Sequence, residues 1–151
     1  MRPRVSFFAA GVPAPQGSKR LVRVRNSNRS IMLESSERVK PWRQTIAAVA
    51  QMHAVPMHSG DVEMHIVCRW PRPQSHLRAD GTVRDSAPAR PSYADVDKLA
   101  RAVCDALAGI AYRNDRQVAS LSIQRVWARS GESAGAHIEI IDISGKSKKM
   151  V

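Results

Sequence analysis

The sequence predicts an α+β fold: one domain in which two main helices pack on a mixed β-sheet. The chain has 151 residues, a length that suits one ordinary domain. Residues 62–70 alternate between apolar and polar side chains, as a strand with one buried face does. Two other segments repeat apolar residues at helical spacing. The resulting order (strands, helix, strand, helix, strand, strand) favours a mixed sheet with the helices on one face.

The N-terminal part of the chain is expected to contain a strand, a hairpin and the first helix. In order, these elements are a strand over 5–9, a Gly- and Pro-rich loop over 11–17, a hairpin formed by 21–25 and 30–33, and a helix over 41–53. Pro41 suits the first turn of this helix because its missing N–H would have no partner there anyway. Trp42, Ile46 and Val49 then recur at helical spacing.

The rest of the chain is expected to add a long loop, the second helix and two strands. These follow the strand at 62–70 as a loop over 71–92, a helix over 95–107, and strands over 118–127 and 136–143. The loop is rich in proline and arginine, and loops this long are usually functional or disordered. On the strand at 118–127 we expect Ala119, Leu121 and Ile123 to share one face. The domain should span residues 1–144, followed by a flexible basic tail over 145–151.

The chain is strongly basic, with 24 Lys and Arg against 13 Asp and Glu and a net charge of +11. Residues 1–60 hold ten of the basic residues and only two of the acidic ones. Such a charge predicts an acidic partner, most commonly nucleic acid. No apolar window is long enough to span a membrane, so no membrane partner is expected. Cys68 and Cys104 stand alone, which favours core thiols in a reducing cytoplasm.

Three acidic residues are placed where they could bind a metal ion. Asp95 and Asp97 stand two positions apart at the start of the second helix, and Asp115 precedes the strand at 118–127. Carboxylate oxygens suit Mg²⁺ or Mn²⁺, and a divalent ion removes the repulsion between clustered acids. Arg101 follows Asp97 by one helical turn, where it could contact a phosphate. The helix is about 18 Å long at 1.5 Å per residue, so only tertiary packing could return Asp115 to the other acids.

The same residues also have a purely structural explanation. Acidic side chains near a helix N-terminus are stabilised by the helix macrodipole. Residues 92–95 match a capping-box pattern, in which Ser92 would cap the helix. Asp97 and Arg101 could form an ordinary surface ion pair. The spacing alone therefore leaves helix capping and metal binding open.

Two motifs carry a resemblance to a known family. Residues 95–107 read D-V-D-K-L-A-R-A-V-C-D-A-L, and residues 114–118 read N-D-R-Q-V. They resemble the pattern D-x-D-N-L-x-K-x-x-x-D-A-L, followed after a short gap by D-D-x-Q-V, of the RusA family of Holliday junction resolvases, which phages and prophages commonly encode. The W-P-R-P segment at 70–73 and the G-x-P and G-S-K segments within 11–19 fit as well. The resemblance covers about residues 5–143.

The resemblance implies a Mg²⁺-dependent endodeoxyribonuclease, with Mn²⁺ as a substitute ion, in the cytoplasm of a bacterium or phage-infected host. It would act as a homodimer on four-way DNA junctions and resolve this branched DNA by paired symmetric nicks, in recombination and repair. Asp95, Asp97 and Asp115 match the family's catalytic, metal-binding acids. Arg101 stands where the family has a functional lysine, which keeps the charge but changes the donor geometry. Lys98 and Asn114 also depart from the pattern, where Asn and Asp are usual.

DNA is expected to be held mainly through its phosphates, because a four-way junction is recognised by its shape. The candidate DNA-binding residues lie in the hairpin, the long loop and the second helix: Lys19, Arg20, Arg23, Arg25, Arg72, Arg78, Arg84, Lys98 and Arg101. Two other classes remain open, a non-catalytic basic nucleic-acid-binding protein and a protein with an acidic protein partner. The acids distinguish them, because a pure DNA binder gains nothing from carboxylates beside a phosphate.

Overall fold

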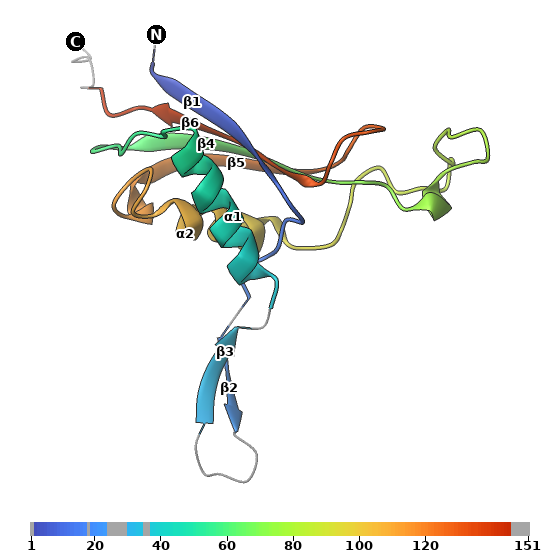
Figure 1. Cartoon of the computed structure of the whole chain (residues 1–151), viewed down its shortest axis with the longest axis horizontal. Coiled ribbons are helices and arrows are strands. Elements are labelled where there is room, and N and C mark those ends of the chain that lie inside the picture. Colours follow the sequence, from blue (N-terminus) through green and yellow to red (C-terminus); the bar gives the residue numbers. More distant parts are fainter. Residues whose placement is uncertain (1, 18, 24–29, 35–36, 146–151) are drawn as a thin grey trace, which may run out of the picture.

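A four-stranded sheet with the strand order β1-β6-β4-β5 forms the body of the molecule (Figure 1). The computed structural model describes residues 2–17, 19–23, 30–34 and 37–145. The strands of this sheet are β1 (Arg4–Ala10), β4 (Val62–Trp70), β5 (Val118–Trp127) and β6 (Gly135–Asp142). The helices are α1 (Val39–Met52) and α2 (Val96–Leu107).

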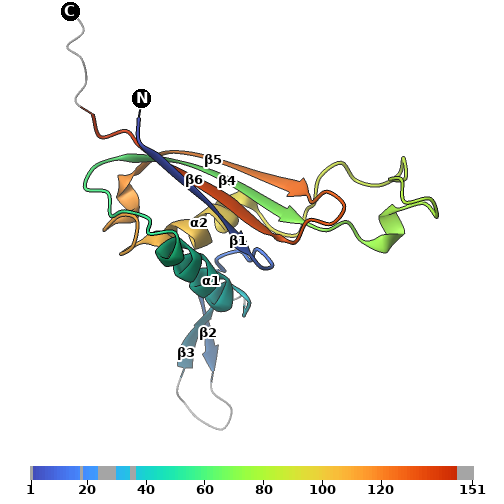
Figure 2. The ribbon, with the colours of Figure 1, turned by 45° about the horizontal axis from the view of Figure 1, so that its top comes forward.

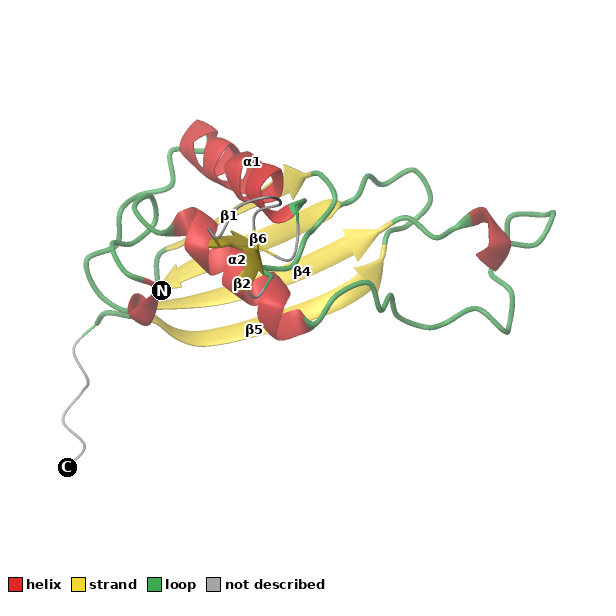
Figure 3. Cartoon of the chain, turned by 90° about the horizontal axis from the view of Figure 1, so that it is seen from below, coloured by secondary structure: helices red, strands yellow, loops and turns green. Residues whose placement is uncertain are grey.

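The sheet is mixed, and both helices cover the same face of it (Figure 3). β4 pairs in parallel with β5 and antiparallel with β6, which in turn pairs antiparallel with β1. Parallel neighbours need a crossover connection, and α2 supplies it between β4 and β5. The predicted α+β class, order of elements and placement of the helices are therefore confirmed.

The core lies between this sheet face and the two helices. β4 follows the predicted alternation along its whole length: its buried side chains are Val62, Met64, Ile66, Cys68 and Trp70. The residues between them are only partly buried and lie on the opposite face. α1 contributes Val39, Trp42, Ile46 and Ala50 to the core. Each of these sets follows the period of its element, which is why the sequence could indicate the buried faces.

The alternation predicted for β5 is wrong at its beginning. A β-bulge shifts the register between the first and second residues of β4, so Ala119 has no partner on that strand. Ile123 packs against the core, but Ala119 is exposed and Leu121 keeps 38% of its surface exposed. β5 is an edge strand with a neighbour on one side only. The bulge and the open edge together explain why only part of the predicted face is buried.

Two segments project from the body (Figures 1 and 2). The first is the predicted hairpin, in which β2 (Lys19–Arg23) and β3 (Ser30–Glu34) pair antiparallel as a separate two-stranded sheet. The second is the loop over 71–92, which has internal structure: a 3-10 turn, η1 (Gln74–His76), and a bridge between Leu77 and Val83. Long loops with such internal pairing are built features rather than plain connections.

Gly135, at the start of β6, has no room for a side chain. A Cβ there would lie 2.4 Å from the carbonyl oxygen of Ala9 and 2.4 Å from the ring of Phe8. Gly135→Ala is therefore expected to lower the free energy of unfolding by about 1–3 kcal/mol, as overpacking does. Urea unfolding measures this change. Gly145→Ala is the matched control because nothing lies within 4 Å of a Cβ there, and an equal effect of both substitutions would contradict the prediction.

Candidate active site

Asp95 stands at the N-terminus of α2, where the capping-box explanation is wrong. The N-cap residue is Asp95 itself rather than Ser92, and its side chain makes no capping hydrogen bond. The Asp95 carboxylate is 72% exposed, and its Oδ2 lies 3.9 Å from Nζ of Lys98. Such an exposed and long ion pair contributes little to stability. The local structure therefore leaves the carboxylate oxygens of Asp95 accessible to another ligand.

Asp97 and Arg101 lie on the exposed side of α2. In the part of the chain that the structure describes, Asp97 forms no ion pair with Arg101. The explanation of these two residues as a surface ion pair is therefore also wrong. Both side chains present their charge to solvent one helical turn apart, as a carboxylate ligand and a phosphate-binding guanidinium would.

A short capped turn at the start of β5 presents Asp115. This turn is the 3-10 segment η2 (Asp115–Gln117), in which the Asn114 side chain accepts from the Arg116 N–H at 2.9 Å. Gln117 Oε1 accepts from the Asn114 N–H at 3.2 Å, and Gln117 Nε2 donates to two backbone oxygens before β4, each at 2.9 Å. Gln117 therefore positions the turn, and Asp115 remains exposed. The sequence motif contains this glutamine, but its spacing alone did not reveal that role.

The length of α2 separates the three acids. Tyr93, two residues before the N-cap Asp95, packs against Trp70 and Trp127, which end β4 and β5. Asp115 lies at the other end of the crossover, where β5 begins. Twelve residues of helix lie between the two ends, which is about 18 Å. The packing therefore does not return Asp115 to the helix start within one chain.

The surroundings of Cys104 confirm where Asp115 lies. Burial raises the pKa of the Cys104 thiol to about 11, and the neighbouring carboxylates of Asp115 and Asp105 add to this rise. Burial likewise raises the pKa of Cys68 to about 12, so both thiols stay protonated at neutral pH and neither is an activated nucleophile. Within the described ranges, no group of three or more His, Cys, Asp or Glu side chains is close enough to hold a metal ion.

The basic hairpin is anchored beside the start of α2. The segment that leads into it, residues 11–17, is fixed by the Gln16 N–H, which donates to the carbonyl oxygen of Lys98 at 3.0 Å. Three of the predicted DNA-binding residues belong to β2: Lys19, Arg20 and Arg23. The fourth hairpin candidate, Arg25, lies outside the described residues. The hairpin therefore emerges at the same end of α2 as Asp95.

The three arginines predicted from the long loop differ in their surroundings. The Arg72 guanidinium lies 5.1 Å from the ring centroid of Trp127 and donates to the Pro88 oxygen at 3.0 Å. Arg78 forms an ion pair with Asp85 at 3.2 Å and so closes the loop on itself. Arg84 is exposed. Arg72 and Arg78 therefore shape the loop, and the binding role of all three stays a prediction.

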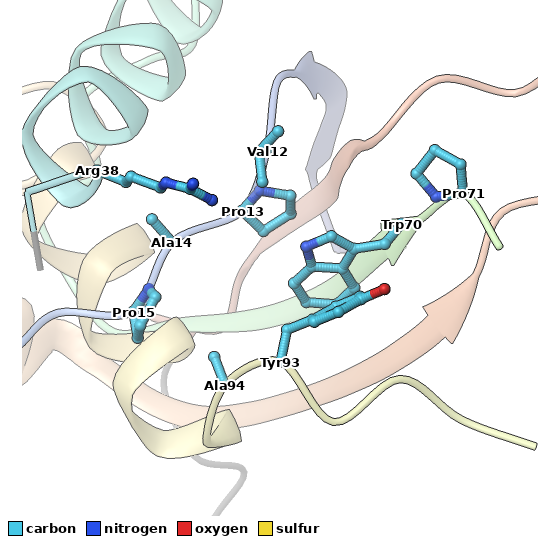
Figure 4. Close-up of a pocket in the computed structure, with 9 residues that line it drawn as sticks. All are labelled: Val12, Pro13, Ala14, Pro15, Arg38, Trp70, Pro71, Tyr93 and Ala94. Atoms are coloured by element: carbon cyan, nitrogen blue, oxygen red, sulfur yellow. The ribbon is translucent and has the colours of Figure 1, made fainter. Parts of the chain in front are cut away.

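A pocket of about 390 Å³ opens beside Ala94, the residue before Asp95 (Figure 4). It lies between the segment at 11–17, the start of α1, the end of β4 and the segment before α2. Its walls include Pro13, Pro15, Arg38, Trp70, Tyr93 and Ala94. The sequence did not reveal this pocket, because four separate segments form it. The one hint of the pocket in the sequence was Tyr93, an aromatic residue with a polar hydroxyl two positions before Asp95.

Residues 10–141 match the family model described as endodeoxyribonuclease RusA. This match covers well over half of the chain, so the chain belongs to the RusA family, as the motifs predicted. Membership implies an endodeoxyribonuclease that resolves Holliday junctions and hence binds branched DNA. No curated protein matches the chain. Across the described ranges, no helix is long and apolar enough to cross a membrane.

The departure at Asn114 can be tested through the turn that it caps. Asn114→Asp restores the family's residue and keeps an acceptor oxygen for the Arg116 N–H, so the free energy of unfolding should change by less than about 0.5 kcal/mol. Asn114→Ala removes the acceptor and should lower that free energy by about 1 kcal/mol, as loss of a capping side chain does. Urea unfolding of the three proteins compares them. A fully stable Ala variant would show that this hydrogen bond does not hold the turn.

Proposed function

We propose that this endonuclease cuts four-way DNA junctions by Mg²⁺-dependent hydrolysis, acting as a homodimer that makes paired symmetric nicks. The main support is the exposure of three carboxylates at the family's motif positions: Asp95, Asp97 and Asp115. Such groups repel a phosphate backbone, and the protein otherwise carries a net charge of +11. Acids at these positions therefore favour hydrolysis over simple DNA binding.

The chemistry assigned to each residue follows from its side chain. Asp95, Asp97 and Asp115 would hold Mg²⁺, with Mn²⁺ as a substitute, because both ions prefer oxygen ligands. The bound ion supplies a water of lowered pKa and positive charge at the scissile phosphate. Arg101, one turn beyond Asp97, would donate to the phosphate oxygens as negative charge builds on them. Lys98 would contribute a second positive charge at the same helix end.

The separation of the acids supports the homodimer. In one chain, Asp95 and Asp97 lie at the start of α2, which is about 18 Å long, and Asp115 lies beyond its other end. A two-fold contact in which the two α2 helices run antiparallel would place each helix start beside the end of the other. Asp115 of each chain would then complete the acid pair of its partner. Two such composite sites, related by the two-fold axis, would cut two strands symmetrically.

The basic residues would hold the arms of the junction. The hairpin carries Lys19, Arg20 and Arg23 on β2 and leaves the body beside the start of α2. The loop over 71–92 projects beyond the sheet (Figure 1). Two extended basic arms in each of two chains would embrace a branched substrate through its phosphates, with little need for contacts to bases. Arg84 is an exposed cation of that loop, and its substitution should weaken binding to DNA of any sequence by a similar factor.

Asp97→Asn is expected to abolish cleavage and to spare binding. The substitution removes a negatively charged ligand with almost no change in volume, and it reduces repulsion of the DNA backbone. Cleavage of a synthetic four-way junction in Mg²⁺ should fall to the level measured with EDTA, while the junction is bound as tightly as before or more tightly. Gel assays of nicking and of band shift measure the two properties.

Glu139→Gln is the matched control, because it removes a carboxylate in the middle of β6, outside both motifs and on the sheet face opposite the buried Ile138 and Ile140. This control should cut the junction like the wild type and should leave a linear duplex intact. Loss of binding together with cleavage in Asp97→Asn would contradict the assignment. Tight junction binding by the wild type without cleavage in Mg²⁺ or Mn²⁺ would instead favour a non-catalytic DNA-binding protein.

Composite sites predict that two inactive variants restore each other. A dimer of one Asp97→Asn chain and one Asp115→Asn chain would contain one site without either acid and one site with the full set. Mixing the two variants under conditions of subunit exchange should therefore recover nicking, up to roughly a quarter of the wild-type sites, since half of the dimers are mixed and one site of each is complete. Sites contained within single chains would recover nothing.

A further inference from the structure

We propose that the pocket lined by Trp70 and Tyr93 receives one unstacked nucleobase of the substrate, next to the phosphodiester that is cut. The inference deepens the proposed function and rests on it. It concerns how the enzyme recognises the branch point rather than how it breaks the bond. Four observations support the inference: the size of the pocket, its aromatic walls, the cation at its rim, and the place of Asp95 directly after the lining residue Ala94 (Figure 4).

The size and the walls of the pocket suit a flat heteroaromatic group. Its volume is about 390 Å³, near the lower end of the range for small-ligand sites. The walls are apolar and include two prolines, Pro13 and Pro15, from the segment after β1. A base that leaves the DNA stack exposes two apolar faces to water, and a pocket of this kind covers them again. No base-specific hydrogen bonds are required for such binding.

The aromatic side chains form a fixed platform. Trp70 is only 5% exposed, whereas Tyr93 is 57% exposed. Their ring centroids lie 5.6 Å apart with the planes at 55°, and the other neighbour of Tyr93 is Trp127, at 5.8 Å and 89°. Contacts with two buried or anchored rings hold the Tyr93 ring in place while more than half of its surface stays available. Stacking of a base on such a ring strengthens binding by about one to two orders of magnitude.

A single cation borders the pocket. Arg38 is the N-cap residue of α1 and lines the pocket, and Figure 4 shows its side chain extending toward Val12 and Pro13. In the part of the chain that the structure describes, the guanidinium has no carboxylate partner. An unpaired guanidinium beside an apolar slot fits a nucleotide, in which a flat base and an anionic phosphate are covalently joined.

The position of the pocket selects DNA over other flat or proline-rich ligands. Ala94 lines the pocket, and the next residue along the chain is Asp95. A base held there would therefore leave its own sugar-phosphate beside the acids. A peptide would gain nothing from that neighbour. The surplus of basic charge over the whole chain favours the same ligand.

This arrangement makes cleavage depend on a base that can leave the stack. Extracting a base from an intact duplex costs free energy, and this cost is lowest for bases that are unpaired or poorly stacked. Where the arms of a four-way junction are not coaxially stacked, the bases at the crossover have lost a stacking neighbour. The pocket would therefore let a branch point, but not a linear duplex, bring its phosphate to Asp95 and Asp97.

The test is an abasic scan combined with substitution of Tyr93. Synthetic junctions each carry one abasic residue, placed in turn at the nucleotides that flank the cut phosphodiester. Cleavage rates are measured at saturating enzyme in Mg²⁺ for the wild type, Tyr93→Ala and Tyr93→Phe. Met52→Ala is the control, because Met52 is an 83% exposed apolar residue at the far end of α1. A thermal melt of each variant checks that it is folded.

At one position the missing base should slow the wild type by about tenfold, in line with the loss of one stacked base. Tyr93→Ala should slow cleavage of the intact junction by a similar factor and be insensitive to the abasic residue at that position, because both changes remove the same contact. Tyr93→Phe keeps the ring and should restore the sensitivity, and Met52→Ala should behave like the wild type. Independent, multiplicative effects of the two changes at every position would overturn the proposal.

A second readout does not need cleavage. Junctions that carry 2-aminopurine at the same positions are bound in EDTA. Binding of the wild type should change the fluorescence of the analogue at one position. Binding of Tyr93→Ala should leave the fluorescence at that position unchanged. A wild type that binds the junction without any such change overturns the pocket assignment. A wild type that produces the fluorescence change but never cuts in Mg²⁺ or Mn²⁺ overturns the proposed hydrolysis instead, so the two failures are distinguishable.

Discussion

The parallel pairing of β4 with β5 is the constraint on which the arrangement of the site depends. Parallel neighbours cannot be joined by a tight turn, so the chain must return along the full length of the sheet, and α2 is that return. The acids of the motif flank this helix. Asp95 and Asp97 therefore lie at the carboxyl ends of the two strands, and Asp115 lies where β5 begins. The two motifs are close in sequence, but their acids lie at opposite ends of α2.

The separation of the acids gives a dimer a different role in catalysis. For an enzyme whose chain held a complete site, a second subunit would only double the number of sites. Here the second subunit would supply a missing ligand, so an isolated chain would bind DNA without cutting it. Such an arrangement would prevent single, unpaired nicks, since cleavage would require both chains on one substrate. The capped turn held by Gln117 matters for the same reason, because it fixes the acid that would be offered to the partner.

The sequence predicted those features that follow from a local period. The alternation on β4 and the helical spacing on α1 each indicated the buried face, because every residue obeys one repeat. The predicted burial of Ala119 was wrong because a bulge interrupts the repeat, and the residue types there do not indicate a bulge. The prediction that Ser92 caps the helix was wrong because the N-cap lies three residues later, at Asp95. The pocket needs four segments that only the tertiary fold brings together.

The aromatic residues connect the two parts of the molecule that sequence analysis treated separately. Trp127 receives the Arg72 guanidinium on its ring and donates its indole N–H to the Pro88 oxygen at 3.0 Å, which closes the base of the long loop. The same ring supports Tyr93 at the pocket. One cluster of aromatic rings therefore joins the basic loop to the proposed base pocket, and Asp95 follows Tyr93 by two residues. A junction arm held by the loop would reach the pocket in a fixed orientation, so binding energy gained at the loop could be used to unstack the base.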